Sequence, residues 1–296
     1  MLGSAIHFEL LQNNKNEIFT KTSTDLDLTN YTKTKEFINK IKPDVIINCA
    51  SLVGGIKANI DKPAQFIHVN NQIQSNLIHL SKENRVKFFC FIGSSCIYPK
   101  FAKQPIKESE LLTSKLEPTN EYYAIAKING LKMLEAYNKE FGLRGVSVMP
   151  CNLYGPNDNF NTSTSHVLSS ILKKSHLAKI NNYKFIELWG DGSALREFMH
   201  VQDAAKAILL AINKTKKYDI VNIGTGKEVD IKSLALTINK ITGFSGNIKW
   251  NKKMPNGTPR KILNISKLNK MGFKPIYNLE NGIKNFYQHT LENKKI

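Results

Sequence analysis

The sequence predicts an α/β fold in which helices flank a parallel β-sheet and a smaller domain lies toward the C-terminus. Short apolar, β-branched runs alternate with amphipathic stretches of helical length through the first half of the chain, a pattern typical of repeated strand–helix–strand units. Of the 296 residues, 41% are hydrophobic and 22% are charged, which is ordinary for a globular protein with a sizeable core. The apolar runs fall short of the roughly 18 residues that a membrane-spanning helix requires.

The first half contains apolar runs that predict buried strands, separated by helical patterns. The strands are expected at 45–50, 88–93 and 145–150, and the helices at about 64–84 and 122–141. Another strand is expected near 18–21. Parallel sheets bind ligands beyond the carboxyl ends of their strands, so the residues that directly follow each strand are the first candidates for a site.

The second half is less regular and is expected to add a smaller domain at the C-terminal edge of the sheet. Its turns include the cluster at 256–259. The expected elements are a helix near 165–178, a strand near 184–189, a helix at about 201–213, a strand at 220–223 and a helical tail from about 279.

The charge and the cysteines narrow the class of protein. The net charge is +18, but only 4 of the 42 basic residues are Arg, and the lysines are scattered through every segment. Proteins that bind nucleic acids concentrate charge and use Arg, so we interpret the charge as solvated surface that also attracts an anionic cofactor and substrate. Four cysteines without a CxxC pair indicate free thiols in a reducing cytoplasm and no metal site. The first residues show no secretory signal.

Tyr123 and Lys127 form a Y-x-x-x-K motif. On a helix these positions share a face, and a nearby cation favours the phenolate, which allows proton transfer near neutral pH. Tyr31 and Lys35 form a second match, which we interpret as a solvated helix face because no hydroxyl-bearing strand end precedes it. Ser94 stands at such a strand end upstream of Tyr123, so we predict a Ser94–Tyr123–Lys127 triad.

Longer segments extend the triad into a resemblance. They read GSSCIYPK (93–100), EPTNE (117–121), MPCNLYGPNDNF (149–160), SHV (165–167), REFMHV (196–201) and GTPRK (257–261). With the triad, they resemble the extended short-chain dehydrogenase/reductases, and among these the epimerase-reductases that act on GDP-4-keto-6-deoxymannose. The resemblance runs over essentially the whole chain.

The resemblance implies an epimerisation followed by a reduction in one pocket. An acid and a base first invert C3 and C5 of the 4-keto sugar, and NADPH then delivers hydride to C4 while Tyr123 supplies the proton. The family's epimerising pair maps onto Cys96 and His166. Both side chains titrate near neutral pH, although on its own such a cysteine is more often a small buried hydrophobe.

The resemblance also implies which residues hold the two ligands. Contacts to the nucleotide diphosphate map onto Lys174, Arg196 and Lys261, and Lys174 lacks the bidentate fork of the arginine found in relatives. Trp189 matches a position that lines the sugar-nucleotide pocket, although structural packing would explain it equally. The expected NADP(H) contacts are Gly3, Lys21, Ser51, Val53, Gly54, Tyr123, Lys127, Pro150, Asn152, Leu153 and His166. The expected domains are a Rossmann-like NADP-binding domain (1–155 and 196–224) and a nucleotide-sugar domain (156–195 and 225–296).

The glycine-rich turn that opens a dinucleotide-binding fold is represented here by its last glycine, Gly3. The strand that precedes this turn is central in such a sheet, and losing its buried side chains costs on the order of 10 kcal/mol. We therefore hypothesise that Met1 is an internal methionine. Lys21 suits a 2′-phosphate, which favours NADP over NAD, whereas Ser23 stands where relatives often carry an arginine.

Two alternative functions stay open at this point. One is another sugar-nucleotide epimerase, dehydratase or reductase on the same scaffold, and the other is a catalytically impaired nucleotide-binding protein that lacks part of its cofactor motif. Cys96 with His166 favours double epimerisation, because a plain 4-epimerase needs no such pair. Relatives usually dimerise through the Tyr–Lys helix and its neighbour, so we expect a homodimer.

Overall fold

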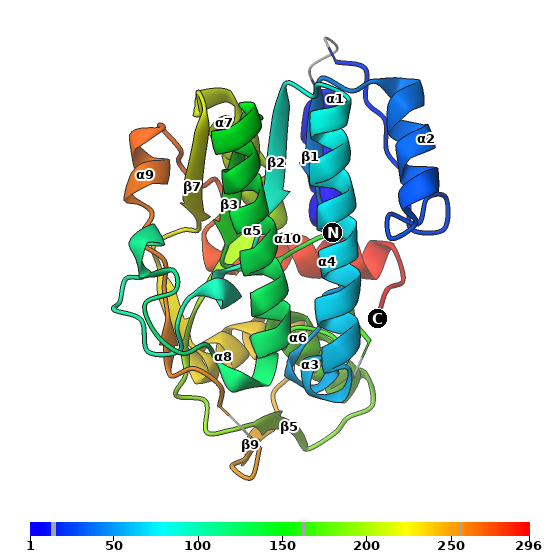
Figure 1. The fold of residues 1–296 in the computed structure, drawn as a ribbon. Helices are drawn as coiled ribbons and strands as arrows, with labels where there is room; N and C mark the ends of the chain where they lie inside the picture. Colours follow the sequence, from blue (N-terminus) through cyan, green and yellow to red (C-terminus); the bar gives the residue numbers. More distant parts are fainter. Residues whose placement is uncertain (13–15, 162–163, 255) are drawn as a thin grey trace.

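The computed structural model describes residues 1–12, 16–161, 164–254 and 256–296. In this part of the chain the central sheet has four parallel strands, shown in Figure 1. In order across the sheet they are β1 (Val45–Asn48), β2 (Phe88–Ile92), β3 (Gly145–Pro150) and β7 (Tyr218–Ile223). The strands β2 and β3 are buried throughout, as expected for apolar runs covered on both faces. The predicted parallel α/β sheet is confirmed.

Helices cover both faces of this sheet (Figure 1). In the view of Figure 1, α4 (Pro63–Glu83) and α5 (Glu121–Phe141) lie side by side in front of the strands. Behind the strands, α1 (Leu2–Leu11) packs against α7 (Val201–Lys214). The predicted helices at 64–84 and 122–141 are thus confirmed to within one residue at each end.

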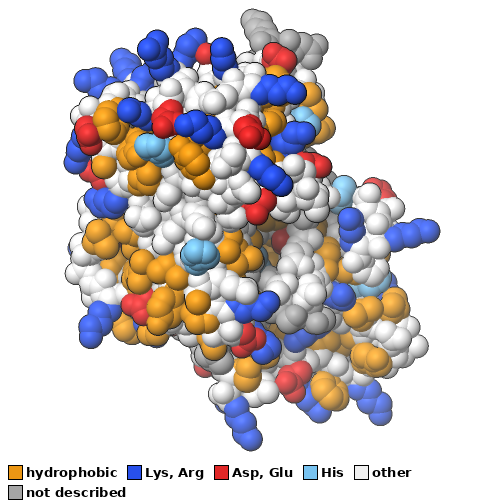
Figure 2. All heavy atoms as spheres, turned by 45° about the vertical axis from the view of Figure 1, so that its right-hand side comes forward, with side chains coloured by type: hydrophobic (Ala, Val, Ile, Leu, Met, Phe, Trp, Pro, Cys, Tyr) orange, Lys and Arg blue, Asp and Glu red, His pale blue; other side chains and the backbone are white. Residues whose placement is uncertain are grey.

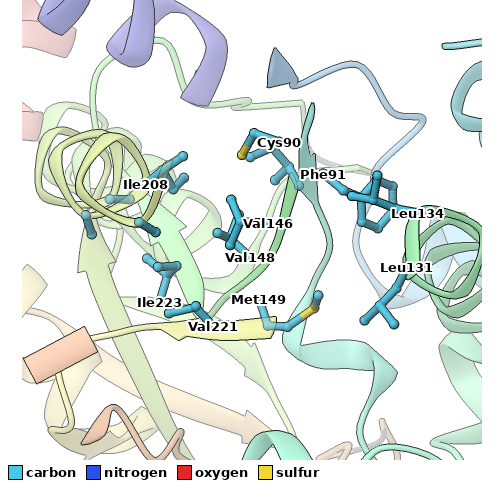
Figure 3. Packing of buried hydrophobic residues seen from close by; sticks show 14 of the residues in the cluster. Cys90, Phe91, Leu131, Leu134, Val146, Val148, Met149, Ile208, Val221 and Ile223 are labelled. Carbon is cyan, nitrogen blue, oxygen red and sulfur yellow. The ribbon is translucent and has the colours of Figure 1, made fainter. Parts of the chain in front are cut away.

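The core between the layers follows the alternation of side chains along a strand. Figure 3 shows Val146 and Val148 of β3 on the side of Ile208, which comes from α7. Leu131 and Leu134 of α5 lie on the other side of the sheet. All five side chains are fully buried. The helices that carry the site are therefore fixed to the sheet by apolar packing on both faces.

Local signals explain where the two front helices begin and end. Pro63 occupies the first turn of α4, a position that needs no backbone N–H. Gly142 ends α5 in the left-handed conformation with φ 73°, which glycine adopts without strain. These two residues therefore set the start of α4 and the end of α5.

The C-terminal half builds a second hydrophobic cluster, which includes Tyr154, Leu172, Ile238 and Phe286. The division into two domains stays a prediction. The elements of this half are β4 (Asn152–Tyr154), α6 (Val167–Ile180), β5 (Phe185–Trp189), β6 (Leu195–His200), β8 (Glu228–Asp230), α8 (Ile231–Thr242), β9 (Asn247–Asn251), β10 (Arg260–Lys261), α9 (Ser266–Lys270) and α10 (Leu279–Glu292). The remaining helices are α2 (Tyr31–Ile41), α3 (Ile56–Asp61) and the 3-10 turns η1 (Ser95–Ile97), η2 (Glu108–Glu110) and η3 (Pro118–Asn120).

Two expectations about the N-terminal strands were wrong. Residues 18–21 have no regular secondary structure, and the run at 45–50 is an edge strand rather than a buried one, with Val45 44% exposed. Within the described residues, β1 pairs with β2 alone, and residues 18–21 pair with no strand. A strand with one neighbour keeps its other edge in solvent.

The surface agrees with the interpretation of the charge. On the face drawn in Figure 2, Lys and Arg side chains are scattered rather than gathered in one basic patch. Among the described residues, no helix is both long and apolar enough to cross a membrane.

Candidate active site

The predicted triad comes together where strands β1 and β2 end. Ser51 follows β1 and Ser94 follows β2, and both hydrogen-bond with Tyr123 in the first turn of α5. Lys127 lies one helical turn further along α5, and its Nζ donates to the carbonyl oxygen of Ile92 at 2.8 Å. The carboxyl edge of the sheet therefore holds a hydroxyl cluster above a buried amine, as parallel topology predicts.

Ser94 also shapes the turn that follows β2. Its Oγ accepts a hydrogen bond from the backbone N–H of Cys96 at 3.1 Å and so caps η1. The residue before it, Gly93, packs directly on Met149, and a Cβ at this position would lie 2.4 Å from the Met149 Sδ. A larger residue where the strand ends would therefore displace the buried Met149 side chain, and Ser94 fixes the position of the next reactive side chain, Cys96.

Tyr123 keeps its proton in this structure. Burial raises the pKa of Tyr123 far above its ordinary value, and the negative charge of a Cys96 thiolate adds to this effect. The hydrogen bonds of Tyr123 with Ser94 and Ser51 act in the opposite direction but are outweighed. The structure differs here from the sequence expectation that Lys127 favours the phenolate. The reason is that the Lys127 Nζ lies 5.9 Å from the Tyr123 ring centroid and is bound to Ile92 instead. A protonated phenol suits a proton donor.

Lys127 fits the nicotinamide end of a dinucleotide. Its side chain is 4% exposed, and burial lowers the pKa of Lys127 to about 8. An ammonium has three N–H donors, and within the described residues Ile92 is its hydrogen-bond acceptor. The remaining donors match the hydroxyls of a ribose.

A Lys127→Met variant should be inactive but more stable than the wild type. Folding depresses the pKa of this lysine from 10.5 to about 8, so the buried ammonium destabilises the fold fully below pH 8. This penalty fades as the pH rises from 8 to 10.5, because the amine is then neutral in both states. Thermal denaturation should show the largest gain in Tm below pH 8 and a vanishing gain at high pH. A gain independent of pH would contradict the depressed pKa.

Cys96 is set apart from the other cysteines by its electrostatic surroundings. Burial on its own raises the pKa of the Cys96 thiol. The net pKa nevertheless lies below the ordinary value, because the positive charges of Lys261 and Arg196 and hydrogen bonds from Ser94 and Lys261 favour the thiolate. The Sγ accepts from the Nδ2 of Asn120 at 3.2 Å and from the Nζ of Lys261 at 3.5 Å. A thiolate at this position is poised to act as a base.

The other three cysteines have raised pKa values. Burial raises the pKa of Cys49 to about 11 and holds those of Cys90 and Cys151 well above the ordinary value. All four thiols are free, and the described residues contain no cluster of three groups able to hold a metal ion.

Backbone pairing holds the two cations beside Cys96. The short strand β10 runs parallel to β6, and its register places Lys261 opposite Arg196. The guanidinium of Arg196 donates to the carbonyl oxygens of Leu195 and Asn256 at 2.8 and 3.2 Å. The structure therefore brings two of the three predicted diphosphate ligands to the Cys96 side of the site.

The remaining predicted substrate residues lie on other elements. His166 is the exposed N-cap residue of α6, and it interacts electrostatically with the carboxyl group of Asp158. The described contacts do not join His166 to Cys96. The Lys174 Nζ donates to the carbonyl oxygen of Glu187 at 2.7 Å, and Trp189 is an exposed side chain at the end of β5, which argues against a packing role.

The start of α1 fits a phosphate group. A Cβ on Gly3 would lie 3.4 Å from the Cβ of Cys49, so this helix begins against the residue that follows β1. The first backbone bond of α1 runs from the N–H of Ala5 to the oxygen of Met1, and Met1 supplies no side-chain cap. The N–H groups of residues 2–4 precede that bond, and such groups bind anions.

The loop after β1 is fixed by a residue that the sequence reasoning missed. The Oδ1 of Asn70 accepts from the Ser51 hydroxyl at 2.6 Å and from the Leu52 N–H at 2.8 Å. Beyond it, Val53 is exposed and Gly54 packs closely on Ala58. Asn70 thus holds the start of the loop, while its tip stays accessible. Asn70 on α4 showed no local signal, because its partners are 18 and 19 residues away.

The other predicted cofactor residues divide into two groups. Pro150 ends β3, and the next strand carries Asn152 and Leu153. The Nδ2 of Asn152 donates to the backbone carbonyl oxygen of Glu197 at 2.8 Å. These residues follow a strand at the same edge as the triad. Lys21, in contrast, is exposed and lies over the Phe37 ring at 5.8 Å, so the structure does not place it at a strand end.

Comparisons with known proteins agree with this geometry. The model of the NAD dependent epimerase/dehydratase family matches residues 1–224. GDP-L-fucose synthase 1 of Arabidopsis thaliana is 46% identical over 293 residues, which cover 99% of this chain and 91% of that protein. GDP-L-fucose synthase of Escherichia coli (strain K12) is 43% identical over 303 residues, covering 99% and 94%. The crystal structure of a GDP-L-fucose synthetase from Naegleria fowleri bound to NADP superposes with a TM-score of 0.90 at 25% identity, covering 99% and 92%.

Proposed function

Because the chain belongs to the NAD dependent epimerase/dehydratase family, we propose that it converts GDP-4-keto-6-deoxymannose to GDP-L-fucose with NADPH. One observation carries the proposal beyond the family. Of four cysteines, Cys96 alone has a lowered pKa, and it lies beside the Ser94–Tyr123–Lys127 triad. A reductase needs the triad, whereas an acidified thiol serves an epimerase.

The epimerisation is a proton exchange on carbons next to the ketone. The Cys96 thiolate removes a proton, the C–H electron pair moves onto the C4 oxygen as an enolate, and a proton from the opposite side restores the carbon with inverted configuration. His166 is the residue assigned to that opposite side. Lys261 and Arg196 lower the pKa of the Cys96 thiol and so favour its anionic form before the transfer, which lowers the barrier of the first step.

The reduction uses the triad. NADPH, when bound, supplies the hydride that C4 receives. Tyr123 donates its proton to the C4 oxygen, and Ser94 orients the Tyr123 hydroxyl. Lys127 holds the ribose of the cofactor and places a positive charge below the phenol.

The proposal is tested with NADPH and GDP-4-keto-6-deoxymannose in deuterated water. Loss of NADPH absorbance is expected together with deuterium at C3 and C5 of the product sugar. Oxidation of NADPH without deuterium at these carbons would identify a plain 4-keto reductase. If the protein exchanged deuterium and left NADPH unchanged, the reduction would be the part that is wrong.

The assembly that we propose is a homodimer formed through the outer faces of α4 and α5, in the cytoplasm. Hydrophobic side chains gather on part of the face drawn in Figure 2, and α5 exposes Tyr122, Ile125 and Phe141. A helix surface of this kind is typical of contact with another protein. The four free thiols fit a reducing compartment.

An Ile125→Asp variant should be monomeric in light scattering, because it puts a charge into the middle of the apolar face. Ile125 is 39% exposed, so the substitution leaves the core intact. The matched control is Leu236→Asp, a 53% exposed position on α8, which should leave the mass unchanged. A wild-type protein that elutes as a monomer at all concentrations would rule out this interface.

A further inference from the structure

Asn120 occupies the N-cap position of α5 without acting as a cap. Asparagine is favoured there because its side-chain oxygen accepts from a free N–H of the first turn, yet the Asn120 side chain makes no such bond. Its Nδ2 instead donates to the Cys96 Sγ at 3.2 Å. The helix thus forgoes a stabilising interaction in favour of a contact with the reactive sulfur.

The direction of this hydrogen bond indicates which protonation form of Cys96 the site favours. Besides the Ser94 hydroxyl, the Cys96 Sγ faces two nitrogen donors, the amide N–H of Asn120 and the ammonium of Lys261. Two donors match a sulfur that accepts hydrogen bonds, which is the thiolate form. Asn120 is therefore directed at the deprotonated base.

The other end of the same amide has no partner. Among the described residues, the Oδ1 of Asn120 is a buried side-chain oxygen without a hydrogen bond. Buried acceptors are nearly always satisfied, and exceptions in native proteins indicate a missing group. This oxygen belongs to the residue that contacts the Cys96 sulfur, so a hydroxyl group of a bound ligand could donate to it.

The backbone that carries Asn120 is anchored independently of Cys96. Asn120 ends the turn η3, whose cap Glu117 accepts from Thr119 at 3.4 Å and pairs with Lys100 at 3.1 Å. The hydroxyl of Thr258 donates to the same carboxylate at 3.3 Å. The amide is thus held in place before any ligand binds.

Resting on the proposed function, we infer that Asn120 is a further catalytic residue of the epimerisation. Its Nδ2–H stabilises the Cys96 thiolate, and its Oδ1 accepts a hydrogen bond from a ring hydroxyl of the hexose. As the C–H bond breaks, the proton passes to the sulfur and the electron pair passes to the ketone oxygen. Asn120 keeps the carbon acid facing the base during this transfer.

The test compares Asn120→Ser with Asn129→Ser. Serine is a good N-cap, so the first variant keeps the start of α5 while losing both contacts. Asn129 lies on the same helix and donates to Asn71 on the surface. For Asn120→Ser, solvent deuterium exchange at C3 and C5 should fall on the order of 10- to 100-fold, and the Asn129→Ser rate should equal that of the wild type.

A second measurement separates catalysis from folding. Alkylation of Cys96 by iodoacetamide, followed by peptide mass spectrometry without substrate, should require a higher pH in Asn120→Ser than in the wild type. An unchanged alkylation profile and an unchanged exchange rate would overturn the role of Asn120. If the wild type neither exchanges deuterium nor oxidises NADPH, the proposed function fails and this role fails with it. If the wild type and Asn120→Ser are equally active, only the catalytic role of Asn120 is contradicted.

Discussion

Replacing Tyr123 by phenylalanine should lower the rate of NADPH oxidation by about 10²- to 10⁴-fold, the usual contribution of a positioned general acid. The hydroxyl lost is the group that Ser94 and Ser51 orient. Its raised pKa keeps it protonated through the neutral range, so the wild-type phenol is ready to donate. The variant retains the ring and its edge contact with Phe66, so folding should be preserved.

Deuterium exchange distinguishes loss of the proton donor from loss of the pocket. Because the proposed base for C3 and C5 is Cys96 rather than Tyr123, Tyr123→Phe should still exchange deuterium at these carbons. Tyr183→Phe is the matched control, since Tyr183 is 59% exposed and lies outside both the site and the proposed dimer face. Its turnover should equal that of the wild type. A Tyr123→Phe protein that reduced the sugar at more than a tenth of the wild-type rate would assign the proton to another group.

The elements around Tyr123 were predictable because their signals are local. The buried strands β2 and β3 are apolar runs bounded by turn residues, and α4 and α5 show helical periodicity, so all four fall close to their predicted bounds. The residues of a strand do not by themselves show whether it has a neighbouring strand on each side. The edge position of β1 and the unpaired segment at 18–21 depended on the rest of the sheet.

The sequence predicted that Ser94, Cys96 and Tyr123 lie close together, as the structure has them, but it predicted their electrostatics less well. The spacing of Tyr123 and Lys127 predicts a shared helix face, but the orientation of the amine toward Ile92 depends on the strand that ends beneath it. Asn120 reads as an ordinary helix cap in the sequence. Only the folded chain brings Cys96, 24 residues earlier, within reach of its amide.

Cys96→Ser should abolish epimerisation more completely than it impairs reduction. A serine hydroxyl occupies the same place but remains protonated at neutral pH, so Lys261 and Arg196 no longer face an anion. Deuterium exchange at C3 and C5 should fall by about 10²- to 10⁴-fold. The triad is untouched, so the variant should still reduce a substrate whose C3 and C5 already have the product configuration.

Thiol chemistry provides an independent check on the same residue. In the wild type, iodoacetamide should modify Cys96 at a lower pH than Cys49, Cys90 and Cys151, whose pKa values are raised by burial. Modification should stop deuterium exchange in step with the loss of the Cys96 thiol. Cys90→Ala, at a fully buried position in β2, should leave exchange at the wild-type rate. Persistent exchange in Cys96→Ser would move the epimerising base to another side chain and reduce the site to that of a 4-keto reductase.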